Sequence, residues 1–188
     1  MAHGVWDKSA PKGVQREQGR GGDTRVRSHI GRAERRRTMG AVYDAMVRFF
    51  DEDDWKYQPV EGKAMLRMGF SGDNGKWTCI ARAVEEADQF IFYSIAPASV
   101  PEEKRVAMAE FITRANYGMR IGNFEMDFSD GELRYKSSID VEGDRLSSPL
   151  VKHMVYPNVL MMDKYLPGIM AIIYAGKSPQ QAVQEIEG

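Results

Sequence analysis

Residues 116–141 have the sequence NYGMRIGNFEMDFSDGELRYKSSIDV, and their pattern determines the architecture expected for the C-terminal half of this 188-residue chain. The pattern predicts the end of a helix, then a strand, a tight turn at Asp130-Gly131 and a second strand. Apolar residues alternate with charged ones on both sides of the turn: Phe124, Met126 and Phe128 with Glu125 and Asp127, then Leu133 and Tyr135 with Arg134 and Lys136. Such alternation is typical of strands with one buried face and one solvent-exposed face.

The turn of this hairpin is expected to be a two-residue type I′ turn, because Asp and Gly both tolerate the positive φ angles that it requires. The charges on the two strands have opposite signs, and they are expected to pair across the hairpin. Cross-strand pairs of this kind contribute about 0.2–1 kcal/mol each and favour one register. We therefore interpret these charges as structural and do not expect a catalytic pair among them.

The sequence from about residue 40 to residue 95 predicts one helix followed by three strands. The helix spans about residues 40–53, and its apolar residues recur at helical spacing: Val42, Ala45, Met46, Phe49 and Phe50. The strands are expected at residues 63–70, 77–84 and 89–95, with turn sequences at residues 71–75 and 85–88 between them. The short turns indicate an antiparallel meander.

A second helix is predicted between the meander and the hairpin. We expect Ser99 to be its N-cap, Pro101 to lie in its first turn and Glu102 to complete a capping box. Its apolar face is Met108, Phe111, Ile112 and Ala115. Gly118 is expected to end the helix in the left-handed conformation.

The chain from Leu146 onward is expected to be helical. Pro157 should bend or restart this helix, and Pro167 should interrupt it. The apolar side of this segment is Val159, Met162, Leu166, Ile169 and Ile173. A last short helix is expected after Ser178, which would cap it, with Ala182, Val183 and Ile186 facing inward.

Together these elements predict an α+β fold in the order α-βββ-α-ββ-α, in which helices cover an antiparallel sheet of about five strands. We assign residues 39–188 to one such domain. A domain of about 150 residues buries roughly 70% of its unfolded surface, so this segment is long enough to form its own core.

Residues 1–38 differ in composition from the rest of the chain. They contain ten Lys and Arg and four acids, a net charge of +6, whereas the remainder contains 16 basic and 23 acidic residues, a net charge of −7. This segment has no Leu, Phe or Tyr, so we expect a disordered basic tail. It is also consistent with a start assigned too early, with Met39 as the true start. A basic arm that contacts nucleic acid or acidic lipid is another interpretation.

A targeting segment is the remaining interpretation of this tail. The run Arg35-Arg36-Arg37 resembles a twin-arginine signal, but Asp44 and Arg48 interrupt the apolar stretch that such a signal needs. No apolar segment follows Met1 in the manner of a secretory signal. No apolar run approaches the roughly 20 residues that span a bilayer, so we expect no membrane association.

The sequence offers little support for catalysis, and we predict no catalytic, cofactor-binding or metal-binding residues. Cys79 is the only cysteine, and it is expected to be a small buried hydrophobe. His153 is expected on the surface of the late helix. The acidic run Asp51–Asp54 lacks the glycine and distal glutamate of an EF-hand loop. Phosphate-binding glycine motifs and paired-cysteine metal motifs are not found.

The chain contains twelve methionines, which is a high number for its length. Nine of them lie in patterned segments: Met65, Met68, Met108, Met119, Met126, Met154, Met161, Met162 and Met170. They are interpreted either as adaptable core residues or as part of an apolar groove for a peptide partner, since unbranched thioether side chains repack easily.

These segments together resemble the YbjN family, described as "putative bacterial sensory transduction regulators". Four sequence features carry the resemblance: Pro101 and its charged followers leading into a helix that ends at Asn116; GNFE at residues 122–125; DGELRY at residues 130–135; and MDKYLP at residues 162–167 with SPQQA at residues 178–182. The resemblance extends over about Met39 to Glu187, and the order and spacing of these features are more specific than any one of them.

The resemblance implies a fold like that of type III secretion chaperones, which are small α+β domains that dimerise and bind polypeptide. It implies a non-enzymatic role and supplies no catalytic residues. We therefore expect a cytoplasmic homodimer that binds a protein or peptide partner. The alternative is a nucleic-acid-binding regulator that uses the basic N-terminal arm.

Overall fold

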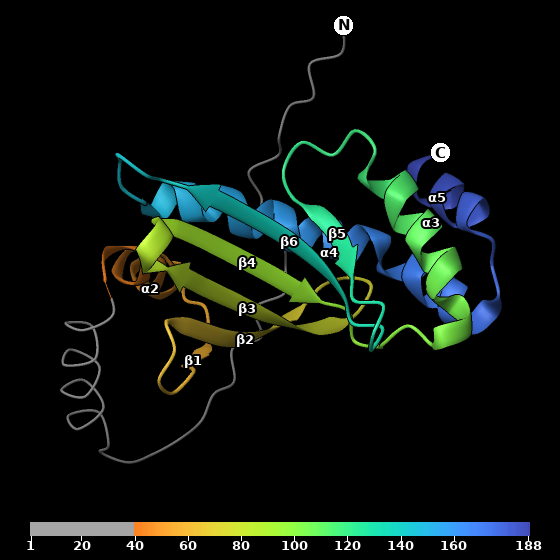
Figure 1. The fold of residues 1–188 in the computed structure, drawn as a ribbon, viewed down its shortest axis with the longest axis horizontal. Coiled ribbons are helices and arrows are strands. Elements are labelled where there is room, and N and C mark those ends of the chain that lie inside the picture. Colours follow the sequence, from red (N-terminus) through yellow and green to blue (C-terminus); the bar gives the residue numbers. More distant parts are fainter. Residues whose placement is uncertain (1–39) are drawn as a thin grey trace, which may run out of the picture.

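The computed structural model describes residues 40–188, which form a six-stranded antiparallel sheet with two helices packed on one face and two more at one end (Figure 1). The expectations for residues 1–38 lie outside the described residues. The helices are α2 (Ala41–Glu52), α3 (Arg105–Asn116), α4 (Ser148–Ala175) and α5 (Pro179–Glu187). The strands are β1 (Tyr57–Pro59), β2 (Met65–Ser71), β3 (Lys76–Val84), β4 (Gln89–Ile95), β5 (Asn123–Met126) and β6 (Leu133–Asp140).

The strands lie in the order β1-β2-β3-β4-β6-β5, and every neighbouring pair is antiparallel. The predicted meander, the hairpin and the α+β class are confirmed. The additional strand is β1, which was not predicted from the sequence because it has three residues and includes Pro59. Proline cannot donate a ladder hydrogen bond, so it is confined to edge strands such as this one.

The core lies between the sheet and the helices α2 and α4. Five of the inward-facing strand residues are fully buried: Leu66, Cys79, Phe90, Phe92 and Tyr135. The predicted apolar side of α4 is buried as well: Val159, Met162, Leu166, Ile169 and Ile173. None of the helices within residues 40–188 is both long and apolar enough to cross a membrane.

The predicted interruption at Pro167 was wrong, and Pro157 does not restart the helix, because α4 is continuous over 28 residues with both prolines inside it. A proline leaves the carbonyl four residues earlier without its helical partner. For Pro167 that carbonyl belongs to Asp163, and the side-chain amide of Asn74 donates to it at 3.1 Å. The Asp163 carboxylate also accepts the backbone N–H groups of Asp73 and Asn74. The β2–β3 turn therefore supplies the hydrogen bond that Pro167 removes.

The β5–β6 turn also differs from the prediction. Only Gly131 has a positive φ, +77°, whereas Asp130 does not, so the turn is not type I′. Its backbone closes through Asp127, whose carbonyl accepts the N–H of Gly131 at 2.8 Å. The longer connection turns Phe128 out of the strand pattern and leaves it 55% exposed, so the prediction that Phe128 is buried was wrong.

The predicted helix caps have mixed outcomes. The capping box at Ser99 and Glu102 was wrong, since a short 3-10 turn, η2 (Glu102–Lys104), precedes α3 and neither element has a side-chain cap. The cap at Ser178 is confirmed, and Gln181 completes a capping box there. Gly118 has the expected positive φ, +87°.

Candidate partner-binding face

One face of the sheet has no described helix over it, and we call it the open face. In Figure 1 it faces the viewer, with α2 and α4 behind the strands. Successive side chains of a strand point to opposite faces, so the residues between the buried ones point outward here. The open face comprises Met65, Arg67 and Gly69 of β2, Lys76, Thr78, Ile80, Arg82 and Val84 of β3, Gln89, Ile91, Tyr93 and Ile95 of β4, Asn123 and Glu125 of β5, and Arg134, Lys136, Ser138 and Asp140 of β6.

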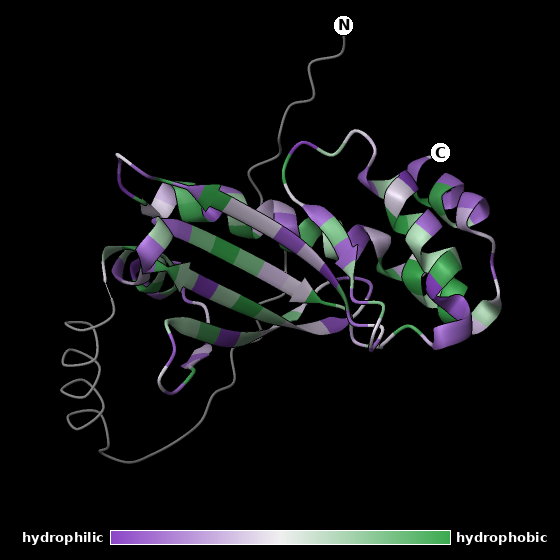
Figure 2. Ribbon diagram, in the orientation of Figure 1, coloured by the Kyte–Doolittle hydropathy of each residue, from purple (hydrophilic) through white to green (hydrophobic). Residues whose placement is uncertain are grey.

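The centre of the open face is an apolar strip that follows β4. Ile91, Tyr93 and Ile95 project from this strand, and Ile80 of β3 lies opposite Tyr93. All four side chains are partly exposed, and none belongs to the hydrophobic core or packs against it. Figure 2 shows the same alternation of hydrophobic and hydrophilic positions along the strands. A strip of this kind is available to another molecule.

Basic residues flank this strip on both sides. On one side, Arg67 and Arg82 are exposed, and neither forms an ion pair with any described carboxylate. On the other side, Arg134 lies opposite Ile95 and Lys136 lies opposite Tyr93. The open face carries five basic residues (Arg67, Lys76, Arg82, Arg134, Lys136) and two acidic ones (Glu125, Asp140), although residues 39–188 as a whole are acidic.

Glu125 holds the two cations of β6 in place. Its carboxylate oxygens accept hydrogen bonds from Arg134 and Lys136, each at 2.6 Å. Partial burial raises the pKa of Glu125, but the hydrogen bonds and charges of Lys136 and Arg134 outweigh this effect, so the pKa lies below its ordinary value. The predicted cross-strand pairing is confirmed for Glu125, whereas Asp127 bonds Ser129 within the turn.

The ring of Tyr93 is covered by a cation. The Arg134 guanidinium lies over it, 4.4 Å from the ring centroid. Such cation–π contacts contribute about 0.5–1 kcal/mol at exposed sites. The Arg134 guanidinium therefore occupies one face of the Tyr93 ring.

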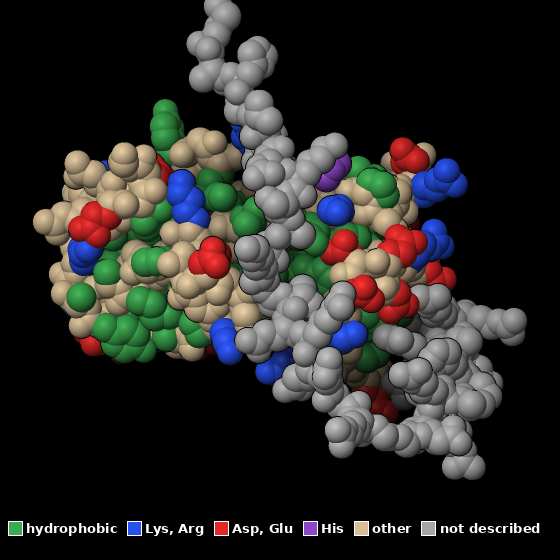
Figure 3. Space-filling model, turned by 180° about the vertical axis from the view of Figure 1, so that it is seen from behind, with side chains coloured by type: hydrophobic (Ala, Val, Ile, Leu, Met, Phe, Trp, Pro, Cys, Tyr) green, Lys and Arg blue, Asp and Glu red, His purple; other side chains and the backbone are tan. Residues whose placement is uncertain are grey.

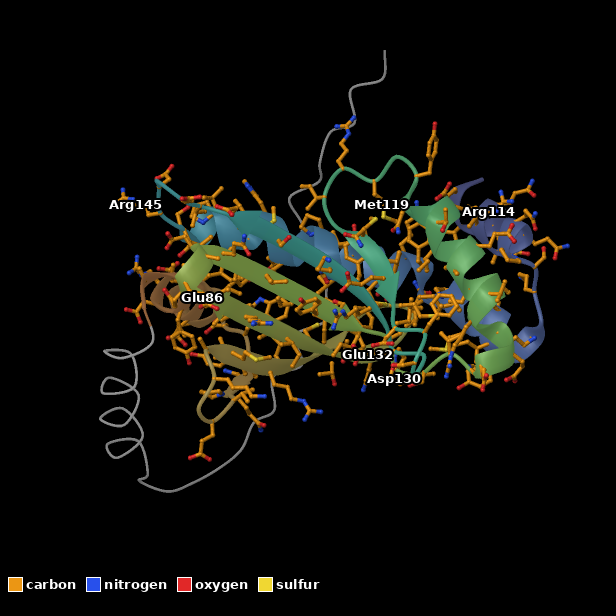
Figure 4. The ribbon with its side chains drawn as sticks, viewed as in Figure 1. Glu86, Arg114, Met119, Asp130, Glu132 and Arg145 are labelled. Atoms are coloured by element: carbon orange, nitrogen blue, oxygen red, sulfur yellow. The ribbon has the colours of Figure 1, made fainter. Side chains whose placement is uncertain are left out.

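A hollow lies at the β1 side of the open face. It has a volume of about 390 Å³ and is lined by Lys56, Tyr57, Gln58, Arg67, Met68, Gly69 and Thr78. Gly69 contributes to it because a Cβ at this position would meet no atom within 4 Å. The hollow thus adds depth beside Arg67. Asp130 and Glu132 lie together at the β5–β6 turn, at one end of the strands (Figure 4), and Glu132 pairs with Arg134 at 3.3 Å.

Both edges of the sheet are protected against pairing with another strand. At β5, the Asn116 side chain accepts the N–H of Phe124 at 2.7 Å and donates to its carbonyl at 3.0 Å. These are the two backbone groups of Phe124 that an added strand would use. At the opposite edge, β1 is short and ends at Pro59. Short edge strands and proline are ways in which proteins prevent edge-to-edge pairing.

Three features of the sequence were candidates for chemistry: Cys79, His153 and the acidic run Asp51–Asp54. Cys79 is fully buried, and burial raises its pKa to about 12. His153 is exposed on α4. Of the acidic run, Asp53 accepts hydrogen bonds from Trp55 and Tyr156. Within residues 40–188 no group of three His, Cys, Asp or Glu side chains could hold a metal ion.

The positions of the methionines agree with the interpretation of them as core residues. Of the nine in patterned segments, all but Met65 are in the core or pack against it. The residues of the apolar strip were therefore not predicted from the sequence. A signal for them was present in residues 89–95, QFIFYSI, where apolar residues occupy both phases of the strand instead of one.

The helical side of the molecule differs from the open face. Figure 3 shows this side, where acidic side chains gather toward the end that carries α2. Cationic and hydrophobic side chains are interspersed among them. The two sides of the molecule therefore present different charge patterns to a partner.

Comparison with known proteins agrees with this fold. The family model described as "YbjN: Putative bacterial sensory transduction regulator" matches residues 43–169. A solved structure, "Crystal structure of YbjN, a putative transcription regulator from E. coli", superimposes with a TM-score of 0.50 at 11% identity. The match covers 71% of this chain and 90% of that one. No curated protein matches the sequence. Because the family model spans more than half of the chain, the protein belongs to the YbjN family.

Proposed function

We propose that this protein is a non-enzymatic regulatory module that binds a partner polypeptide on the open face of its sheet. The observation that carries the proposal is the apolar strip along β4 with its basic flanks, which no described helix covers. Exposed apolar surface rimmed by polar residues is typical of protein–protein interaction sites. The family's description as a sensory transduction regulator supports a role in regulation.

The surroundings of the titratable groups support a non-enzymatic role. Catalytic groups converge in a concave site and have a free path to substrate. Two tyrosines instead owe a raised pKa to the packing around them: burial raises the pKa of Tyr135 and of Tyr156 to about 12 each, and Asp53 adds to the effect on Tyr156.

The test is capture of partners from native lysate by the full-length chain, with quantitative mass spectrometry. The variant Ile80→Thr/Ile91→Thr makes the strip polar and retains β-branched residues that suit a strand. The control, Val106→Thr/Leu160→Thr, changes two exposed apolar residues on α3 and α4. We expect specific proteins that the wild type and the control capture and the strip variant loses. Identical eluates from all three chains would contradict the proposal.

We further propose that the protein is a cytoplasmic homodimer, on the basis of the family's chaperone-like fold. The open face repels a second copy of itself because both carry an excess of cations, so the dimer contact belongs elsewhere on the molecule. Light scattering after size exclusion should give twice the 21.3 kDa chain mass. A monomer at all concentrations would contradict this proposal, and recovery of the native protein in the membrane fraction would contradict the location.

A second candidate function is nucleic-acid binding, which the five cations of the open face favour. The E. coli protein of similar fold is described as "a putative transcription regulator". Binding of duplex DNA by the full-length chain should then fall steeply with salt, and deletion of residues 1–38 should weaken it if the basic arm contributes. No DNA binding by the full-length chain at low salt would exclude this function.

A further inference from the structure

We propose that the open face binds an acidic amphipathic helix, two to three turns long, whose apolar stripe lies along β4 and whose Asp and Glu side chains lie on both sides of that stripe. This inference rests on the proposed function and specifies the chemistry of the partner. The occupant is a segment of another polypeptide.

Backbone hydrogen bonding favours a helix over an extended segment. A strand that lies flat on the face of a sheet leaves its own N–H and C=O groups without partners as it buries them. A strand could satisfy them at a sheet edge, but Asn116 occupies the β5 edge and Pro59 lies in β1. A helix satisfies its backbone internally, and only its side chains need to match the face.

The dimensions of the open face also fit a helix. Side chains from Ile91 to Ile95 span about 13 Å at roughly 3.3 Å per residue, which matches about two and a half helical turns of 5.4 Å. The strands on either side of β4 are β3 and β6, so Arg82 lies on a strand about 10 Å across the sheet from the strand of Arg134 and Lys136, and Arg67 lies one strand farther out. A helix is about 10–12 Å wide with its side chains, so both of its flanks would lie over cations.

The distribution of charge specifies acids on both flanks. Arg82 and Arg67 lie on the β3 and β2 side without described carboxylate partners. On the β6 side, Arg134 and Lys136 share the carboxylate of Glu125, and Arg134 also pairs with Glu132 at 3.3 Å. A partner with a carboxylate over each flank would pair with both groups of cations. A second copy of this chain would bring the same cations to the interface, and like charges placed face to face disfavour binding.

Nucleic acid fits this face less well than a helix does. Sequence-tolerant binding of bases relies on aromatic rings whose faces are free for stacking. Tyr93 is the only aromatic residue of the open face, and Arg134 lies over its ring. The three isoleucines beside it offer apolar contact without stacking, which suits aliphatic side chains of a helix.

The test uses fluorescence anisotropy with the full-length chain and labelled 15-residue peptides. The acidic peptide carries Leu at helical spacing i, i+3, i+7, i+10 with Glu on both sides. The second peptide has Lys in place of each Glu, and the third is a scrambled acidic peptide without the Leu stripe. We expect the acidic amphipathic peptide to bind at least tenfold more tightly than the other two, and its binding to weaken with salt.

Two double variants with the same change in charge test the location. Arg67→Glu/Arg82→Glu alters one flank of the strip, and we expect it to weaken binding of the acidic peptide at least tenfold. Arg48→Glu/Arg120→Glu changes two exposed residues on α2 and on the loop before β5, and binding should remain within twofold. Circular dichroism confirms that both variants are folded.

Three outcomes would overturn the inference: no saturable binding of the acidic peptide, equal binding of the scrambled peptide, or equal losses in both double variants. The proposed function would still hold after such a result if the Ile80→Thr/Ile91→Thr variant still loses the proteins that the wild type captures from lysate. The opposite result is also distinguishable. If the acidic peptide binds at the open face but no lysate partner depends on that face, the proposed function is refuted and the preference for an acidic helix is not.

Discussion

Asn158 is the residue that joins α4 to the sheet through polar contacts. It is fully buried, and its side-chain amide donates to the carbonyls of Phe92 and Tyr135 and to the hydroxyl of Ser137. Ser137 in turn donates to the carbonyl of Met154. These contacts connect β4, β6 and α4 at one point. Nothing in the sequence around Asn158 indicates this role, because its partners are 21 to 66 residues away.

We predict that Asn158→Ala lowers the free energy of unfolding by about 2–4 kcal/mol, because it creates a cavity and leaves buried acceptors without their donor. Urea denaturation followed by circular dichroism measures the change. Asn123→Ala, at a half-buried position of β5, serves as the control and should cost less than about 1.5 kcal/mol. Equal losses in the two variants would show that Asn158 has no special role.

The ion pairs of Glu125 predict a dependence of stability on pH. The pKa of Glu125 is lower in the folded protein than its ordinary value of 4.5, so the unfolded state takes up a proton first as the pH falls. The stabilisation is therefore complete above pH 4.5 and is lost as the pH falls through the folded pKa. We expect Glu125→Gln to cost about 0.5–1 kcal/mol at pH 7.

This cost should disappear at low pH, where the wild-type carboxyl group is also neutral. Urea midpoints at neutral and acidic pH measure it, and Glu103→Gln, at an exposed position before α3, is the control. A difference between wild type and Glu125→Gln that stays constant down to about pH 3 would contradict the assignment.

Among the elements, β5 has its outer edge protected by a side chain of α3, Asn116. We predict that Asn116→Ala lowers the free energy of unfolding by about 1–2 kcal/mol, through the loss of two hydrogen bonds to Phe124. It should also increase self-association with concentration, because an unprotected edge strand pairs with other chains.

Size exclusion across a range of concentrations and urea denaturation measure these two effects. Thr113→Ala, which changes an exposed residue on the same helix, should behave as the wild type in size exclusion. If Asn116→Ala remains as stable and as monodisperse as Thr113→Ala, the amide does not protect the edge.

The sequence predicted those elements that are determined by residues close together in the chain. The alternation around Asp130-Gly131 located the hairpin, and the serine before Pro179 located the cap of α5. The continuity of α4 could not be predicted in the same way, because the donor for the Asp163 carbonyl is Asn74, 89 residues away. The turn type was missed for a similar reason: Asp130 accepts the N–H of Glu132 and helps the longer connection to form.

The candidate site was predicted only in outline. The high methionine content left two interpretations open, core residues or an apolar groove for a polypeptide partner, and all but one of the nine methionines in patterned segments are in the core or pack against it. The actual strip combines Ile80 with residues of β4, and only the register of β3 against β4 brings them together. Its basic flanks come from β2, β3 and β6, so the charge pattern exists only in the assembled sheet.

At the scale of the whole molecule, the described chain has α2 and α4 on one face of the sheet and an uncovered, cation-rich face on the other (Figure 1). Because residues 39–188 carry a net charge of −7, the excess of cations on the open face is a local feature. Clustered charge of one sign steers an oppositely charged partner and increases its rate of association. Our central claim is that this face contacts the physiological partner.

Site-specific photo-crosslinking of the full-length chain in its native cells tests that claim most directly. A benzophenone amino acid replaces Tyr93 on the open face in one chain, and Arg48 on α2 or Arg120 before β5 in two control chains. We predict discrete protein adducts from Tyr93 and none of the same mass from Arg48 and Arg120. Adducts from the control positions alone, or no adduct from the Tyr93 position, would contradict the claim.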